Sequence, residues 1–594
     1  MRRVMVAITL IAWLVGTATA PAAGQSATSS PDEKVTFTVG VTYDLNSANP
    51  IKSIDGNEWD VHGLQYDGLV RYGQQDYAVQ GEMVDRWDVS DDGLTYTFYL
   101  KEGLTWSDGV PLTAHDFVWT ANFIIDNEIG QWLDGYRHTE DIVATDDHTI
   151  VWTTSRPTLA PAFPAYTLTL PEHIWGGMSK QEALDFRDFP DPVVSGPFQL
   201  VDWEADYWRM EARDDYYGGD PAIDELIFRV YNNDEAVVQA LLKGAIDYTA
   251  IPTAALYERL QDEPNIEAVA TSAEAFWQLS FNLAPTTASE AGPASTANPA
   301  VRDPAFRRAV LAAIDKERLI ERVIGGYGSP ATSPIAEAYP FWHWEPPPDE
   351  FIPFDPNLAR TMLDDAGYLD SDADGVRESP ETGEPLQLRL FVESADSDGL
   401  DAATYIQAWL RDVGIDASFR TMTWSKLLDF WYEHDWDMLI SSWSTGPDPD
   451  LLLWSFTSGQ CGLDLWSDTC YSNPEYDALY IEQQTLLDPD ERQAVVHEMQ
   501  QILYRDMPEI QLWYPNSFEA WRSDRWTGFL PWPEPDGLRF HTYSVMNIRP
   551  VTGAVAAGPD AGPSGIVWLV GLGLLVGMLL LTRRRHRRAD AYYA

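Results

Sequence analysis

A run of acidic side chains at alternate positions is the part of this sequence with the most recognisable chemistry. Residues 370–381 read DSDADGVRESPE, which matches the pattern D-x-D-x-D-G-x5-E of calcium-binding loops. Carboxylates spaced in this way can converge on one hard cation, and the glycine permits the sharp turn that this requires. The candidate ligands are the side chains of Asp370, Asp372, Asp374, Glu378 and Glu381 and the carbonyl oxygen of Val376. We therefore predict a structural Ca²⁺ site and no other cofactor.

Two residues of this loop depart from the pattern. Arg377 stands where an aliphatic residue is usual, and Pro380 precedes Glu381, where it prevents a regular helix from following the loop. The alternative is a solvated acidic loop within a β-hairpin. If Ca²⁺ binds, we expect it to stabilise the surrounding domain and to take no part in catalysis.

Motifs of hydrolytic and phosphate-transferring enzymes are absent from the sequence. It contains no G-x-S-x-G, no H-E-x-x-H and no P-loop, and its ten histidines are dispersed. The 92 aspartates and glutamates are too numerous for a pair of glycosidase carboxylates to be singled out. We therefore predict that the protein is not an enzyme.

The charge of the chain excludes a further class of function. The formal net charge is −53, and a surface of that sign repels the phosphates of nucleic acid. The acidic, lysine-poor composition indicates a salty habitat or, alternatively, a GC-rich genome that prefers arginine to lysine.

The elements that must position any site alternate between aliphatic strands and capped helices. Strands are predicted at residues 35–41, 226–231, 386–392 and 415–421. Helices are predicted from Asp234 to Gly244, after Asp303, from Asp355 to Gly367 and from Thr404 to Val413, with proline following the cap in two of them. This alternation predicts an α/β fold with partly parallel sheets. The chain is longer than one domain usually is.

A strand between two Asp-Gly turns carries the strongest family signal. Residues 87–100 read WDVSDDGLTYTFYL, and a second turn leads into PLTA-x-D at 111–116 in the run WSDGVPLTAHDF. Period-two alternation over 94–100 predicts a strand, and Thr113 with Asp116 stands where a helix would be capped. The run resembles the signature of family-5 solute-binding proteins of ABC importers, the dipeptide, oligopeptide and nickel type. Further pieces in the family's order include LPEHIW at 170–175, SGPF at 195–198, LSFN at 279–282 and YSNPEYD at 471–477.

The resemblance implies a periplasmic-binding-protein fold with two lobes around a cleft and an extra inserted domain. Lobe I is expected at residues 34–49, 194–283 and 518–550, the inserted domain at 50–193 and lobe II at 284–517. It also implies a function: capture of a peptide or similar solute in the cleft and delivery to ABC permease subunits that work with cytoplasmic ATPases. An oligosaccharide-binding receptor of the same family is the nearest alternative. A surface carbohydrate-active enzyme and a sensor ectodomain are the others.

The same resemblance implies which residues line the cleft. Trp424 and Trp443 match aromatic cleft residues, and Ser444, Thr445 and Gly446 follow the second of them. Peptide receptors of the family carry an aspartate at the position of Gly446, where it pairs with the peptide's amino terminus. Asp448 or Asp450, close by, could substitute for it, and Asp448 is the one expected at the site. By position alone, Tyr43, Trp277, Asn282 and Tyr514 are further candidates. Loss of the aspartate leaves peptide and oligosaccharide both open, because aromatic side chains can stack on sugars.

The two ends of the chain predict export and anchoring. Two arginines precede an apolar stretch and then small residues, which predicts a signal peptide at 1–24. A flexible stalk at 551–564, a transmembrane helix at 565–582 and a basic cytoplasmic tail at 583–594 follow the ectodomain. The expected location is the cell membrane, with a single span and an extracellular or periplasmic ectodomain. The only two cysteines, Cys461 and Cys470, are expected to form a disulfide in that compartment.

Overall fold

The computed structural model describes residues 34–52, 56–163, 167–187, 189–251, 253–289, 292–462 and 466–551. The predicted signal peptide, the predicted transmembrane helix at 565–582, its basic tail and all but the first residue of the predicted stalk lie outside these residues. Within them, no helix combines the length and the apolar character needed to cross a membrane.

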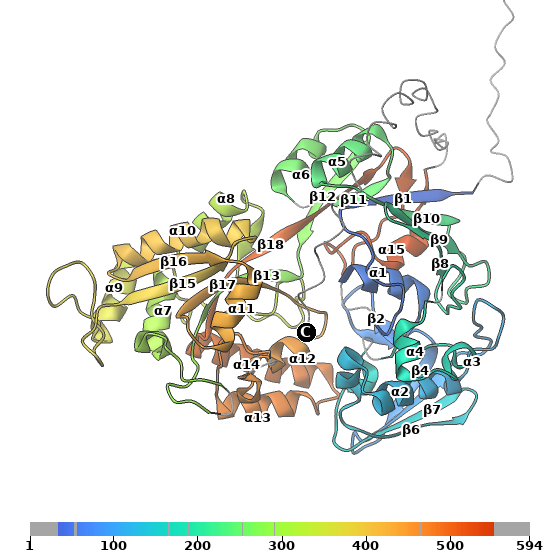
Figure 1. The fold of residues 1–594 in the computed structure, drawn as a ribbon, viewed down its shortest axis with the longest axis horizontal. Helices are drawn as coiled ribbons and strands as arrows, with labels where there is room; N and C mark the ends of the chain where they lie inside the picture. Colours follow the sequence, from blue (N-terminus) through green and yellow to red (C-terminus); the bar gives the residue numbers. More distant parts are fainter. Residues whose placement is uncertain are drawn as a thin grey trace, which may run out of the picture.

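One long strand joins the two lobes. β18 (Glu509–Arg522) pairs through its first half with β13 (Ala275–Phe281) and β14 (Gly328–Pro330). Its second half pairs with β12 (Ile266–Ser272) and β11 (Tyr248–Ile251). The result is one twelve-stranded sheet in which β18 passes diagonally from one lobe to the other (Figure 1). The expected two-lobe α/β architecture is confirmed.

Lobe I is built on a mixed sheet. β1 (Thr36–Val41) runs parallel to β10 (Glu225–Val230) and β11, and the antiparallel strands β9 (Tyr207–Ala212) and β8 (Phe198–Glu204) extend the sheet. Its helices are α5 (Asp234–Lys243), α6 (Ala254–Gln261) and α15 (Thr542–Asn547). α5 ends where predicted, because Gly244 takes a left-handed φ of 71°. The predicted strands 35–41 and 226–231 are confirmed to within one residue at each end.

Lobe II carries three parallel strands. β15 (Gln387–Glu393) lies between β16 (Asp416–Met422) and β17 (Met438–Ser444), and both neighbours run parallel to it. The sheet is covered by α7 (Pro304–Ala313), α8 (Lys316–Val323), α9 (Pro356–Asp365) and α10 (Ser397–Asp412). α11 (Trp424–Tyr432), α12 (Asp450–Trp454), α13 (Pro474–Gln483) and α14 (Pro489–Asp506) complete the lobe.

Helix starts in lobe II follow the predicted caps, with one exception. Asp303 and Asp355 accept hydrogen bonds from the first turns of α7 and α9, as their sequences predict. α10 begins earlier than the predicted Thr404, because the carboxylate of Asp396 accepts from the amide of Gly399 and caps a first turn made of polar residues. Apolar periodicity does not register such a turn.

The inserted domain is an antiparallel sheet with helices. Its strand order is β4 (Val84–Val89), β5 (Thr95–Leu100), β7 (Thr149–Thr154) and β6 (Thr139–Asp146), beside the hairpin of β2 (Val70–Tyr72) and β3 (Val79–Gly81). The helices of this part of the chain are α1 (Gly56–Gln65), α2 (Ala114–Asn127), α3 (Glu172–Trp175) and α4 (Lys180–Asp185). The Thr113 amide donates to Asp116 at 2.8 Å, so the predicted helix cap forms. Gly93 and Gly109 supply left-handed φ values at the two predicted turns.

Direct contacts join the inserted domain to lobe II. Arg156 donates to the side-chain oxygen of Gln484 at 3.0 Å, and the guanidinium of Arg137 lies 5.6 Å from the centre of the Trp454 ring on α12. Tyr77 donates to the carboxylate of Glu274, at the start of β13, at 2.5 Å. The two sides of the molecule therefore meet opposite α12 and the end of β17.

Candidate functional site

A cavity of about 780 Å³ lies at the carboxyl ends of the three parallel strands of lobe II. In open α/β sheets this edge is where ligands usually bind, because the loops that follow parallel strands converge there. Its lining residues are Glu393, Asp396, Trp424, Leu427, Leu428, Trp431, Tyr432, Leu439, Ile440, Ser441, Ser442, Trp443, Ser444, Trp466 and Asp468. We call it the strand-end cavity.

Aromatic side chains from three elements form its walls. α11 starts directly after β16 and contributes Trp424 and Trp431, whose ring centroids are 6.5 Å apart. Trp443 near the end of β17 lies 6.4 Å from Trp466 of the following loop. Trp424 and Trp466 are each 45% exposed, so their faces are open to a ligand. Three of the predicted ligand-binding residues, Trp424, Trp443 and Ser444, are therefore brought together here.

A buried carboxylate stands behind these rings. Asp468 is 8% exposed; it accepts from the indole nitrogen of Trp443 at 2.6 Å and from the amide nitrogen of Gln278 at 2.7 Å. Gln278 also donates to Glu509 at 3.3 Å. Burial raises the pKa of Asp468 to about 6. The pKa of Glu509 lies well above its ordinary value, first because of burial and then because of the charge of Asp468.

Asp448, the predicted partner for a ligand's amino terminus, is already paired within the protein. Both of its carboxylate oxygens accept from Arg492, at 2.5 and 2.8 Å. Arg492 is 4% exposed and also donates to Gln483. A carboxylate held in this way has little to offer a ligand ammonium. Gly446 itself borders open space, since a Cβ added there would meet only the carbonyl oxygen of Asp448, at 4.0 Å.

The other predicted ligand residues have structural contacts. Trp277 stacks on Trp513 with ring centroids 5.5 Å apart, and buried Asn282 donates to the carbonyl oxygens of His434 and Trp436. Further contacts hold Tyr43 against Trp208, Tyr514 to the carbonyl oxygen of Ser333, and the carbonyl oxygen of Thr445 to the hydroxyl of Tyr339. None of these five residues lines the strand-end cavity. Resemblance of position placed them near the lobe junction, where β13 and β18 also supply the core.

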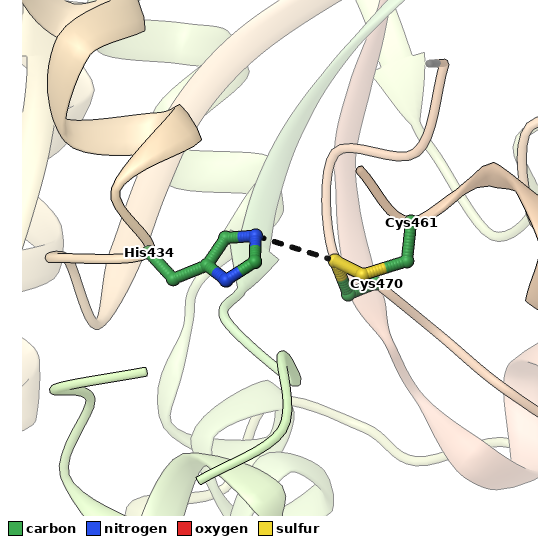
Figure 2. A group of neighbouring side chains, drawn as sticks. All are labelled: His434, Cys461 and Cys470. Carbon is green, nitrogen blue, oxygen red and sulfur yellow. Dashed lines mark hydrogen bonds between the residues drawn. A yellow bond between two sulfur atoms is a disulfide. The ribbon is translucent and has the colours of Figure 1, made fainter. Parts of the chain in front are cut away.

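A disulfide anchors the loop that supplies Trp466 and Asp468. Cys461 and Cys470 are bonded to each other, and the ring of His434 points at them, with its Nε2 3.8 Å from the sulfur of Cys470 (Figure 2). The other ring nitrogen of His434 lies 3.0 Å from the carbonyl oxygen of Pro293. Because both sulfurs are consumed by the bond, this group offers no thiolate to a metal. Its role is to fix the loop against lobe II.

The acidic loop gathers a somewhat different set of carboxylates from the predicted one. Oxygens of Asp370, Asp372, Asp374 and Glu378 lie within 4.8 Å of one another. Glu381 is not in this group, because the chain turns back at Ser379, whose hydroxyl accepts from the amide of Glu381. The last predicted ligand, Glu381, therefore lies outside this group of carboxylates.

A second cavity, of about 370 Å³, lies between the inserted domain and the C-terminal part of lobe I. Its lining includes Arg71, Glu82, Trp132, Trp532, His541 and Tyr543. Burial raises the pKa of Glu82 to about 8 and lowers that of His541 to about 4. No predicted site residue lies here.

Among the lining residues of the strand-end cavity that sequence reasoning missed are its three acids and two of its tryptophans: Glu393, Asp396, Asp468, Trp431 and Trp466. For the first two, a signal was present. They directly follow the predicted strand at 386–392, and residues at the carboxyl end of a parallel strand are placed to meet a ligand. Trp466 and Asp468 follow no periodic segment, so only the neighbouring cysteine marked their loop.

Comparison with known proteins identifies the family of the chain. The sequence model of the bacterial extracellular solute-binding proteins, family 5, matches residues 78–463. The oligopeptide-binding protein AppA of Bacillus subtilis is 24% identical over 85% of this chain and 91% of its own length. The probable periplasmic-binding protein SapA of Escherichia coli is also 24% identical, over 88% and 95%.

Solved structures share the fold. AppA of Bacillus subtilis, in complex with a nonapeptide, matches with a TM-score of 0.65 and 23% identity, covering 87% of this chain and 99% of that one. A periplasmic oligopeptide-binding protein of Thermotoga maritima matches with a TM-score of 0.74 and 20% identity, covering 88% and 100%.

Proposed function

The chain belongs to the family 5 extracellular solute-binding proteins, and from this we propose that it captures a peptide between its lobes and delivers it to the permease of an ABC importer. The observation that carries the proposal is the strand-end cavity, in which exposed Trp424 and Trp466 flank Trp443 above a buried carboxylate. The peptide is proposed because AppA of Bacillus subtilis is an oligopeptide-binding protein whose structure holds a nonapeptide. The oligosaccharide alternative is an outcome of the test.

The function is tested by binding without turnover. Titration of the purified protein with short peptides in a calorimeter should give saturable heat with micromolar or better affinity. Mass spectrometry of the mixture after long incubation should recover the peptide intact. Steady formation of a cleavage product would mean that the protein is an enzyme. Binding of oligosaccharides but not of peptides would mean that it is a sugar receptor.

Truncation of the cavity tryptophans should weaken that binding. Trp424→Ala and Trp443→Ala each remove a stacking surface worth about 1 kcal/mol or more, so we expect the dissociation constant to rise about fivefold or more. Trp424→Ala is the cleaner variant, because Trp443 also donates to Asp468. The control is Trp119→Ala, which changes a partly buried ring on α2 that stacks on Phe123 and lines neither cavity. If both cavity variants bind like the control, the ligand lies elsewhere.

We also propose that the acidic loop binds one structural Ca²⁺. A ligand bound only by the native state stabilises it by mass action, by about 2.7 kcal/mol at a hundredfold excess over the dissociation constant. Calcium should therefore raise the melting temperature of the protein, and EDTA should lower it. The Asp372→Asn/Asp374→Asn variant should lose this response, whereas Asp401→Asn, which alters an exposed acid of α10, should keep it. An unchanged melting temperature in calcium and in EDTA would leave only an acidic turn.

Anchoring is the last part of the proposal. The apolar run at 565–582 and the arginines after it support a single span with the ectodomain outside. Protease added to intact cells should release the ectodomain by cutting near residues 551–564 and should leave a C-terminal epitope tag protected. Labelling of that tag from outside would reverse the proposed topology.

A further inference from the structure

The strand-end cavity is lined by acids without any base. Among the residues that the structure describes, its charged lining side chains are Glu393, Asp396 and Asp468, and none of the lining residues is lysine, arginine or histidine. Lys426 is close in sequence, on α11, but its ammonium lies 3.1 Å from Asp429 and 4.9 Å from the Phe430 ring, and it is not among the lining residues. A ligand that presents a carboxylate to this cavity would meet only negative charge.

Several buried hydrogen-bond acceptors lie together behind the cavity. Asp468 receives one bond each from Gln278 and Trp443, and Glu509 behind it accepts from the same Gln278 amide group, from Ser280 and from Gln511. The side-chain oxygen of Gln278, a residue only 1% exposed, has no hydrogen-bond partner in the part of the chain that the structure describes. It lines a small cavity of about 10 Å³ whose wall also includes Trp443 and Asp468.

This small cavity has room for about one water molecule. It adjoins the strand-end cavity, since both are lined by Trp443 and Asp468. The group that the Gln278 oxygen faces is therefore a donor: a water, the proton that Glu509 holds when it is protonated, or a ligand group that carries several N–H bonds. A buried carboxylate pairs best with a charged donor, because a charge-assisted hydrogen bond is about twice as strong as a neutral one.

The aromatic walls favour the same ligand chemistry. A cation over the face of a tryptophan ring is attracted by the negative charge of that face. Trp424 and Trp466 are the exposed tryptophans of the cavity lining. Trp443 also lines the cavity and donates to Asp468 through its indole nitrogen. An ammonium or guanidinium group in this cavity would therefore be attracted both by the tryptophan faces and by the carboxylate of Asp468.

We propose that the strand-end cavity selects a cationic group of its ligand, the lysine or arginine side chain of a basic peptide, and that Asp468 is the carboxylate that pairs with it. The proposal rests on the proposed function, because it names the class of peptide bound at the same site. The negative charges of Glu393 and Asp396, which line the same cavity, also attract a cationic group. Asp448 does not contribute, because it is paired with Arg492.

The test is a titration of the full chain with probes of equal length and different charge. Trilysine, trialanine and triglutamate are compared by calorimetry at pH 8 and low salt, with cadaverine as a cation that is not a peptide. Trilysine should bind about tenfold or more tightly than trialanine, and triglutamate should not bind. Asp468→Asn should weaken trilysine about tenfold and trialanine less than twofold.

Two further variants keep the result interpretable. Glu393→Gln leaves the hydrogen bonds of Asp468 intact and should weaken trilysine selectively, so the charge series remains decisive even if Asp468→Asn folds poorly. Asp401→Asn, an exposed acid outside the cavity, should change nothing.

The outcomes separate the two proposals. Equal affinity for trilysine and trialanine, or tighter binding of triglutamate, would overturn cationic selection and leave peptide binding in place. Binding of cadaverine without any of the peptides would support the cationic site and overturn the peptide. Binding of no probe would overturn both.

Discussion

Replacing Arg492 by methionine is expected to lower the free energy of unfolding by about 3–5 kcal/mol, the largest effect that we anticipate from a single substitution. The cause is the negative charge of Asp448, which the substitution leaves without its partner. Asp448 is 13% exposed at its side chain, and both of its oxygens depend on the guanidinium of Arg492. Methionine removes both hydrogen bonds and leaves a carboxylate in surroundings that cannot solvate it.

Groups near the Asp448–Arg492 pair increase the expected loss of stability. Asp450, two residues on, has a pKa above its ordinary value, first because of burial and then because of the charge of Asp448. The Arg492 guanidinium also lies 4.8 Å from the centre of the Trp342 ring. Without the arginine, the two acids would keep only neutral donors: the Asp450 amide for Asp448, and Gln483, Gln484 and Tyr480 for Asp450.

Chemical denaturation of matched variants checks this. The double variant Asp448→Asn/Arg492→Met should recover much of the loss, because no buried charge is left unpaired. Arg411→Met is the control, since Arg411 is 67% exposed and lies 3.6 Å from Asp416; such a surface pair contributes about 1 kcal/mol or less. A single variant as stable as the double one would mean that water reaches Asp448.

Asp448 also shows where sequence reasoning stops. Its place two residues after Gly446 made it the natural substitute for the missing aspartate of the peptide receptors. Its partner, Arg492, comes from α14, and nothing in the local sequence links the two. Asn282 and Tyr514 show the same limit: their polar groups donate to distant backbone carbonyls, at residues 434 and 333, and no local sequence signal predicts these contacts.

Local signals served the fold better than the site. The caps at Asp303 and Asp355, the turn glycines at 93 and 109, and the strands at 35–41 and 386–392 each depend on neighbours in sequence. The pairing of β18 with four strands from distant segments does not, and it is this strand that joins the lobes. Trp424 and Trp443 both line the strand-end cavity; Trp424 follows the predicted strand at 415–421, whereas Trp443 belongs to β17, a strand that the sequence did not predict.

The second large effect concerns pH and the acids behind the strand-end cavity. Asp468 and Glu509 both have pKa values raised by burial, that of Asp468 from 3.8 to about 6. The folded protein therefore holds these protons at a pH where the unfolded chain has lost them. Stability from this pair is fully present below about pH 4 and is lost as pH rises, through about pH 6 for Asp468 and higher for Glu509. For Asp468 alone the loss is about 3 kcal/mol, because each pKa unit is worth about 1.4 kcal/mol.

Substitution by amides should remove this loss. Glu509→Gln keeps an acceptor for Ser280 and Gln278 and adds N–H groups that Asp468 lacks. We expect it to melt at a higher temperature than the unaltered protein at pH 8 and at nearly the same temperature at pH 4.5. Glu267→Gln, an exposed acid on β12, should show no such pH-dependent difference. Equal melting temperatures at pH 8 would mean that the pair ionises freely, and then Asp468 would carry its charge without cost before any ligand arrives. If Glu509→Gln is the more stable protein at pH 8, as expected, the ionised carboxylates destabilise the unaltered protein when no ligand is bound. A cationic ligand should then restore part of that stability on binding.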